Sequence, residues 1–195
     1  GHADFAGALK FKQHDLRNVL ERASARETTS RVAAGSLCKS LLKKLNIEIK
    51  SRVLSIGNVT SNDINENLEN INWEQTEISE VRSSSINMDE KFKDAILESK
   101  RNKTTIGGIF QVVAFNLPVG LGNFSQWDRK LDGKIAQAMM SINAVKGVEI
   151  GNGFSNTKKP GSEVQDVIVP DNKDRRNFKH VTNHAGGLEG GVTNG

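Results

Sequence analysis

One stretch of the sequence, residues 25–45, constrains the fold more than any other part. Its apolar residues recur at intervals of three and four, which predicts a helix with one buried face. These apolar residues are Ala34, Leu37, Cys38, Leu41, Leu42 and Leu45. Ser24 and Glu27 have the Ser-x-x-Glu spacing of a capping box, and Lys43 and Lys44 suit the negative end of a helix dipole. We therefore expect a long helix that begins close to Ser24.

Strands and helices follow without a regular repeat. Alternation of apolar and polar residues from Ile47 to Gly57 predicts a strand, and the apolar run 106–117 predicts a well-buried one. Residues 155–180 are predicted to form a long loop or hairpin. The other predicted elements are helices over 89–101 and 131–144 and a short strand over 148–150. Because no βαβ order is visible, this mixture favours an α+β fold with antiparallel pairing over a doubly wound sheet.

The length of 195 residues suits one domain, and we expect a single domain over 1–195. Residues 58–90 are rich in Asn, Ser and Glu, which predicts an exposed, variable excursion with little regular structure. The sequence begins at Gly1 without Met and ends within a glycine-rich run. These two ends lead us to expect a fragment of a longer protein, truncated at both ends.

Composition narrows the function classes. The net charge of +4 and the pI near 9.2 favour anionic partners. The two Trp and eight Phe are scattered and Tyr is absent, so the aromatic and basic stripe of a nucleic-acid-binding surface is missing. Small phosphorylated ligands would explain the same charge. No apolar run reaches the roughly 18–20 residues of a membrane span. Cys38 is the single cysteine, which favours a reducing compartment such as the cytoplasm.

The start of the long helix is the sharpest candidate site. A helix N-terminus offers free backbone N–H groups to an anion, and Arg22, Arg26 and Arg31 add forked donors that match phosphate or carboxylate. The hydroxyl of Ser24 could complete such a site. The alternative is a solvent-facing helix start in which Arg26 and Arg31 pair with nearby carboxylates. The local pattern alone favours this alternative.

Two further features allow more than one interpretation. His2, in Gly-His-Ala-Asp, could donate a proton near neutral pH, but Gly-His at a chain end is also typical of an expression-tag remnant. The run Gly186-Gly187-Leu188-Glu189-Gly190-Gly191 requires unusual backbone geometry or close approach to another group. It lacks the spacing of known phosphate-binding loops. The histidines have no metal-ligand spacing, so no metal is expected.

The order of the motifs is distinctive. After Gly-His-Ala-Asp come ERASARETTSRVAAG (21–35), LPVGLG (117–122), MSINAVKGVEIGNGF (140–154) and TNHAGGLEGGVTNG (182–195). In this order they resemble chorismate synthase over nearly the whole chain, least over 58–90. The resemblance implies a β-α-β sandwich, with helices layered between antiparallel sheets, and a homotetramer in the cytoplasm.

The resemblance also implies an activity. Chorismate synthases catalyse the 1,4-anti elimination of phosphate from 5-enolpyruvylshikimate 3-phosphate (EPSP), the last step of the shikimate pathway of aromatic amino acid biosynthesis. They are carbon–oxygen lyases that require reduced FMN without net redox change. NADPH enters as an indirect reductant, and the sequence leaves open whether the parent protein reduces its own flavin.

Site residues carry over by position. Arg22, Ala23 and Ser24 match an FMN-contacting tripeptide, Asn143 and Ala144 a second contact, and Gly190 a third. Arg26 and Arg31 match arginines that hold the substrate, with Ser24 and Ala25 at the same place. His2 matches a catalytic histidine beside the flavin, which overrides the tag interpretation.

Other family parts are missing from this sequence, including a Gly-Glu-Ser-His-Gly motif and a Lys-Pro-Thr/Ser flavin contact. We therefore expect the chain alone to be inactive or nearly so. The alternative to an active enzyme is a non-catalytic fragment that binds FMN or phosphate without turnover. A small basic nucleic-acid-binding protein is a third hypothesis, and it predicts salt-sensitive affinity and indifference to FMN.

Overall fold

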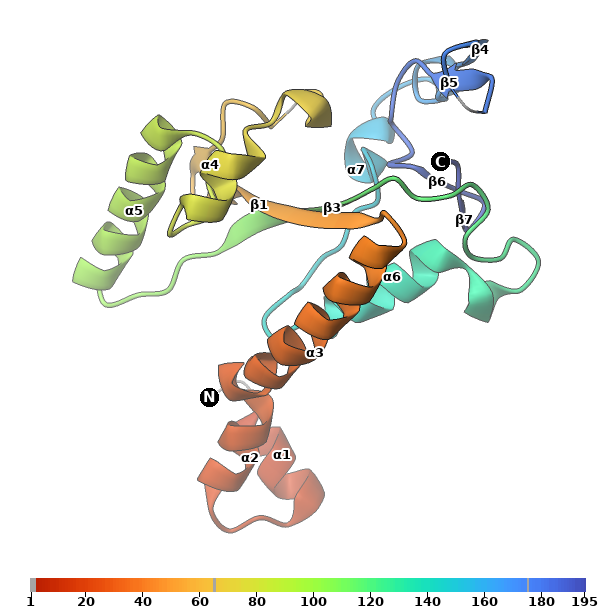
Figure 1. Cartoon of the computed structure of the whole chain (residues 1–195). Coiled ribbons are helices and arrows are strands. Elements are labelled where there is room, and N and C mark those ends of the chain that lie inside the picture. Colours follow the sequence, from red (N-terminus) through yellow and green to blue (C-terminus); the bar gives the residue numbers. More distant parts are fainter. Residues whose placement is uncertain (1–2, 65, 175) are drawn as a thin grey trace. The chain divides into compact units, whose positions relative to one another are not determined.

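The structure is a computed structural model that describes residues 3–64, 66–174 and 176–195. The chain folds into two compact units. Unit 1 comprises residues 1–41 and 116–195, and unit 2 comprises residues 42–115. Helices and small antiparallel sheets occur in the described chain, as the predicted α+β class requires (Figure 1). The single domain expected over 1–195 stays a prediction.

Unit 1 begins with a pair of short helices, α1 (Asp4–Phe11) and α2 (Leu16–Ala23), which pack together at the red end of Figure 1. The Asp15 carboxylate caps α2 by accepting from the Arg17 amide at 2.9 Å. Val19 on α2 is buried, and Gly7 on α1 lies so close to it that a Cβ there would overlap its side chain. A glycine is thus what lets the two helices approach.

The long helix α3 (Ala25–Lys44) follows after one residue. It confirms the predicted helix, but its apolar face is not buried: Leu37, Leu41 and Leu45 are 75%, 62% and 64% exposed. The spacing of the apolar residues predicts the helix correctly, because the helical period is a property of the local backbone. Burial of the stripe needs a partner surface, which the described part of this chain does not place over it.

The rest of unit 1 carries short elements and tight hairpins. A 3₁₀ turn η2 (Trp127–Arg129) leads into α6 (Leu131–Met140), followed by α7 (Gly153–Asn156) and η3 (Gly161–Glu163). Two antiparallel hairpins complete the unit: β4 (Ile168–Pro170) with β5 (Phe178–His180), and β6 (Leu188–Glu189) with β7 (Val192–Thr193).

Two predictions for this part need correction. The helix predicted over 131–144 ends at Met140, four residues early, because Ala144 adopts a left-handed backbone (φ 70°) that no helix can contain. Residues 148–150, predicted as a strand, have no ladder partner and are irregular. The predicted loop or hairpin over 155–180 contains the β4–β5 hairpin.

Unit 2 is built on a three-stranded antiparallel sheet in the order β2-β1-β3. The long strands are β1 (Glu48–Ile56) and β3 (Gly108–Phe115), paired from Glu48 with Phe115 to Ile56 with Gly108, and β2 (Val59–Thr60) is short. The helices α4 (Trp73–Ile78) and α5 (Ile86–Arg101) contact β1. The buried apolar side chains of the unit are Ile47, Ile71, Met88 and Phe92.

Strand β3 is present as predicted, but the prediction that its side chains are well buried was wrong. Ile109, Phe110 and Val112 are 57%, 42% and 46% exposed. The strand lies at the edge of the sheet, with one neighbour instead of two. A continuous apolar run predicts a strand whose two faces are both covered by other elements. In the described chain, the elements around β3 cover these faces only in part.

The segment 58–90 also differs from the prediction of an exposed excursion with little regular structure. It holds β2, a 3₁₀ turn η1 (Leu68–Asn70), α4 and the start of α5. Several of its side chains are buried, among them Thr76, Ser83 and Met88. The polar composition misled the prediction because these serines and threonines form hydrogen bonds inside the unit. Sequence variability of the segment stays a prediction.

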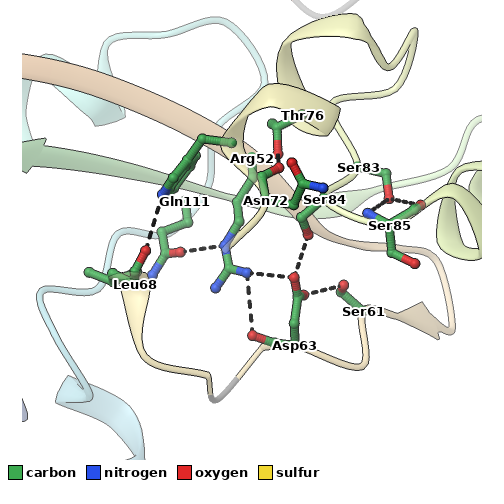
Figure 2. A network of polar contacts seen from close by, with 11 residues as sticks. Arg52, Ser61, Asp63, Leu68, Asn72, Thr76, Ser83, Ser84, Ser85 and Gln111 are labelled. Atoms are coloured by element: carbon green, nitrogen blue, oxygen red, sulfur yellow. Dashed lines mark hydrogen bonds and ion pairs between the residues drawn. The ribbon is translucent and has the colours of Figure 1, made fainter. Parts of the chain in front are cut away.

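A buried arginine organises this polar interior (Figure 2). The side chain of Arg52 on β1 is fully buried and forms an ion pair with Asp63 at 3.0 Å, while its Nε donates to the Gln111 amide oxygen at 2.8 Å. The Asp63 carboxylate also accepts from the hydroxyls of Ser61 and Ser84. Burial alone would raise the pKa of Asp63, but the two hydroxyls and the Arg52 charge outweigh it and hold the pKa below its ordinary value.

None of the helices in the described ranges is long and apolar enough to cross a membrane. Within the same ranges, no three His, Cys, Asp or Glu side chains gather in a way that could hold a metal ion.

Candidate functional site

The candidate site lies in unit 1, where α2 ends and α3 begins. Ser24 is the single residue between them, with an extended backbone (φ −87°, ψ −179°). Its amide donates to the Leu20 carbonyl at 2.9 Å, and its hydroxyl accepts from the Arg26 amide at 3.3 Å. The predicted capping box is therefore only half formed: the Ser24 amide is used by α2, so Glu27 cannot reach back to it.

A second motif, 140–144, meets this junction from far along the chain. The Asn143 Nδ2 group donates to the carbonyls of Ala23 and Ser24, both at 2.8 Å. A carbonyl oxygen can accept a hydrogen bond but cannot donate one, so the two carbonyls must face the Nδ2 group and thereby fix the orientation of the Asn143 amide. The left-handed backbone of Ala144 turns the chain directly after this contact. The structure thus joins two of the three predicted FMN contacts through hydrogen bonds.

Arg31 lies further along α3 and also contacts the second motif. Its Nε donates to both carboxylate oxygens of Glu27, at 2.8 and 2.9 Å, and its Nη1 donates to the Ser141 hydroxyl at 2.8 Å. The Ser141 hydroxyl donates in turn to the Ala138 carbonyl at 2.6 Å. Ser141 was missed by the sequence reasoning, although it stands two residues before Asn143 in a motif that we had singled out.

Arg26 forms an ion pair with Glu21 of α2, and its side chain is 74% exposed. The Arg26 guanidinium holds the pKa of the Glu21 carboxyl below its ordinary value. Both arginines that were predicted to bind the substrate are thus paired with carboxylates, as the solvent-facing alternative describes. Exposed pairs of this kind contribute little to stability, so an anionic ligand can displace the carboxylate at little cost. Their role in substrate binding stays a prediction.

Three other predicted site residues are placed less completely. Arg22 is exposed in the last turn of α2. Ala25 begins α3, and its side chain lies outside the described residues, as does the whole of His2.

Gly190 forms the turn between β6 and β7 together with Gly191, and both have positive φ angles, 63° and 95°. The Gly191 carbonyl accepts from the amides of Leu131 and Asn123, at 2.8 and 3.2 Å, which ties the turn to the start of α6. A Cβ at Gly190 would meet open space. No hydrogen bond among the described residues joins Gly190 to the α2–α3 junction.

Asp166 is a second residue that the sequence did not reveal. Its buried carboxylate accepts from the Thr182 hydroxyl at 2.6 Å and from the amides of His184 and Ala185, at 2.7 and 2.8 Å. Burial alone would raise the pKa of Asp166, but these three donors outweigh it and hold the pKa below its ordinary value. Asp166 thereby anchors the segment that leads to the Gly190 turn. An acidic residue in a polar loop gives no signal for such a role.

Two open hollows lie in unit 2. The more polar one, of about 250 Å³, is lined by residues such as Asp63, Glu66 and Ser84. The other is mainly apolar and is lined by the paired ends of β1 and β3 and by Ile96 of α5. No residue that was predicted to bind FMN or substrate lines either hollow.

Comparisons with known proteins agree with the motifs. The family model described as chorismate synthase matches residues 1–195. A chorismate synthase from Sulfurihydrogenibium sp. (strain YO3AOP1) is 53% identical over 199 residues, covering 100% of this chain and 50% of that protein. One from Staphylococcus aureus (strain JH9) is 48% identical over 196 residues, covering 100% of this chain and 49% of that protein.

A solved structure described as "Crystal Structure of Chorismate Synthase" superposes with a TM-score of 0.92 at 46% identity, over 99% of this chain and 59% of that one. This likeness confirms the predicted fold class. The chain spans about half the length of the curated relatives it matches. With a family model over every residue and relatives near 50% identity, the chain belongs to the chorismate synthase family.

Proposed function

We propose that this chain forms part of a chorismate synthase that eliminates phosphate from EPSP with the help of reduced FMN. The family assignment supports the lyase reaction and its place in aromatic amino acid biosynthesis. The observation that carries the proposal is the contact between two separate family motifs, in which Asn143 holds the α2–α3 junction and Arg31 reaches Ser141.

The residues present fit an anionic flavin cofactor. The junction presents the exposed cations Arg22 and Arg26 beside a helix N-terminus, the donor set that a phosphate or a reduced flavin requires. Both Nδ2 hydrogens of Asn143 are used on carbonyls, so its side chain can offer a ligand only the acceptor Oδ1. The open space over Gly190 admits a flat group close to the backbone.

On this proposal Arg22, Ala23, Ser24, Asn143, Ala144 and Gly190 would hold FMN. When bound, the reduced flavin supplies electron density to an electron-poor substrate without net redox change. Arg26 and Arg31, with Ser24 and Ala25 beside them, bind the substrate anion and stabilise the charge that grows as the C–O bond to phosphate breaks. His2, as an imidazolium, would balance the negative charge of the bound cofactor. Phosphate leaves with the electrons of the C–O bond, the electrons of the C6–H bond form the new double bond, and the C6 proton would pass to the bound reduced flavin.

The chain covers about half the length of its relatives, and the other half of those proteins would also contribute to activity. We infer that residues 1–195 alone give at most trace turnover, and that the complete enzyme is a cytoplasmic homotetramer supplied with reduced flavin, with NADPH as the indirect reductant. Light scattering of the complete enzyme tests the tetramer. A monomeric mass at assay concentration would contradict it.

The test of function has two steps. Anaerobic titration of the purified chain with dithionite-reduced FMN measures binding, and release of phosphate from EPSP measures turnover. Binding without turnover agrees with the inactive-fragment proposal, and the complete enzyme should then form chorismate. Robust turnover by the 195-residue chain would contradict the inactivity, and a complete enzyme that releases no phosphate from EPSP would contradict the function.

A further inference from the structure

We propose that Ser141 is a positioning residue that holds the Arg31 guanidinium in place for the substrate anion. The proposal rests on the proposed function, in which Arg31 binds the substrate. Ser141 touches neither flavin nor substrate on this account. It acts through Arg31, by means of the hydrogen bonds that the two side chains form.

The hydroxyl of Ser141 has a defined direction. It donates its one hydrogen to the Ala138 carbonyl at 2.6 Å, one turn back in α6. Its lone pairs are therefore the part that faces Arg31, and they accept from Nη1 at 2.8 Å. Because the serine is fixed at the end of α6 by its own backbone bonds to that helix, it is a rigid acceptor rather than a mobile one.

The two partners of Arg31 do different work. Glu27 is four residues away on the same helix, so its carboxylate fixes the arginine only relative to α3. Ser141 is 110 residues away in sequence and fixes the guanidinium relative to the turn that carries Asn143. The Arg31 side chain is 42% exposed, and without Ser141 only Glu27, on the same helix, would hold its guanidinium.

The two contacts also decide which part of the guanidinium remains available. Nε is used by Glu27, and one hydrogen of Nη1 is used by Ser141. No hydrogen bond among the described residues involves Nη2. The second hydrogen of Nη1 and both hydrogens of Nη2 thus form the open end of the fork, which matches two oxygens of a phosphate or carboxylate.

Steady-state kinetics of the complete enzyme test the proposal. We expect Ser141→Ala to raise the KM for EPSP about tenfold, as for loss of a hydrogen bond to a charged group, with the affinity for reduced FMN unchanged. Ser141→Thr keeps the hydroxyl and should retain near wild-type KM. Ser36→Ala is the matched control, because it removes a hydroxyl that donates to the Val32 carbonyl in α3 and that forms no hydrogen bond with an arginine of the described ranges.

A double-mutant cycle separates positioning from a structural role. In an Arg31→Ala background, Ser141→Ala should have no further effect on KM, since the group that it positions is gone. The same tenfold loss in that background, an equal loss of FMN affinity, or a Ser141→Ala enzyme as active as Ser36→Ala would each overturn the proposal. If Arg31→Ala alone left the KM unchanged, the premise about Arg31 would fail, and the proposal with it.

Discussion

Arg52 in unit 2 and Arg26 in unit 1 carry the same guanidinium in opposite surroundings. Arg52 is fully buried and bonded to an aspartate, a backbone carbonyl and a glutamine (Figure 2). Arg26 is 74% exposed and paired with one glutamate from the neighbouring helix. The buried arginine is committed to the fold, because water cannot replace its partners. The exposed one can exchange its carboxylate for a ligand, as a binding residue must.

The largest expected effect comes from making the same substitution at both positions. Arg52→Met leaves the half-buried Asp63 carboxylate without its cation, which should cost about 3–5 kcal/mol of unfolding free energy. Arg26→Met should change stability little. Urea unfolding followed by far-UV circular dichroism reports on both units. Trp73 fluorescence, in a Trp127→Phe background, reports on unit 2 alone, where the Trp73 ring lies edge-on to Phe115 with the centroids 5.8 Å apart. Equal stabilities for the two variants would refute the contrast.

A second prediction concerns the anchor of the glycine-rich segment in unit 1. Asp166→Asn places an amide N–H where a carboxylate oxygen accepts from a backbone amide, so two donors face each other. We expect a loss of about 2 kcal/mol and faster hydrogen exchange at the amides of His184 and Ala185. Asp171→Asn, which alters a contact to the Lys173 amide at 2.9 Å and an ion pair with Lys179 at 3.4 Å, is the control. Unchanged protection at both amides would contradict the anchoring role.

A third prediction uses pH to test the Arg52–Asp63 ion pair of unit 2. The folded pKa of Asp63 lies below the ordinary value of 3.8, so the stability that it contributes is complete above that value and is lost as pH falls toward the folded pKa. Acid titration of unit 2, followed by Trp73, should show this loss below about pH 4. The Asp63→Asn variant should be less stable at neutral pH. Its free energy of unfolding should also depend less on pH in the acid range, because the carboxyl that titrates there is gone. An unchanged acid limb in that variant would exclude Asp63 as its source.

The smallest effect is expected from removing the carboxylate that competes at the junction. Glu21→Gln leaves Arg26 without its ion-pair partner, so the affinity of the complete enzyme for EPSP should rise by less than about tenfold, while stability changes little. Calorimetric titration with EPSP measures this affinity for the wild type and for the variant. A weaker affinity in Glu21→Gln would show that the pair orients Arg26 for the ligand rather than competing with it.

The sequence predicted the elements better than their surroundings. Residues 25–45 and 47–57 form a helix and a strand because their periodicity is a property of the local backbone. The burial of Leu37 and Ile109 was predicted wrongly, since it depends on surfaces that other segments must supply. Composition misjudged 58–90, where hydrogen bonds among Ser61, Asp63 and Ser84 allow polar side chains to be buried.

For the candidate site, the motifs were predicted from sequence and their contacts were not. The resemblance singled out Ser24 and Asn143, but nothing in their spacing shows that the Asn143 amide bonds the junction. Ser141 contacts Arg31, which is 110 positions away in the sequence. Asp166 contacts residues that are 16 to 19 positions away. No local sequence pattern encodes contacts over such separations. The pairs formed by Arg26 and Arg31 were foreseen as the alternative to ligand binding.

The central claim is that the arginines at the start of α3 bind the substrate anion. Isothermal titration of the complete enzyme with EPSP, in the presence of oxidised FMN so that no turnover occurs, tests it most directly. Arg26→Ala should weaken EPSP binding by about 100-fold, which is the scale of a lost charge-assisted contact. Arg101→Ala is the control, because it removes the same charge at the exposed end of α5. It should leave the affinity unchanged. Equal affinities for wild type, Arg26→Ala and Arg101→Ala would contradict the account.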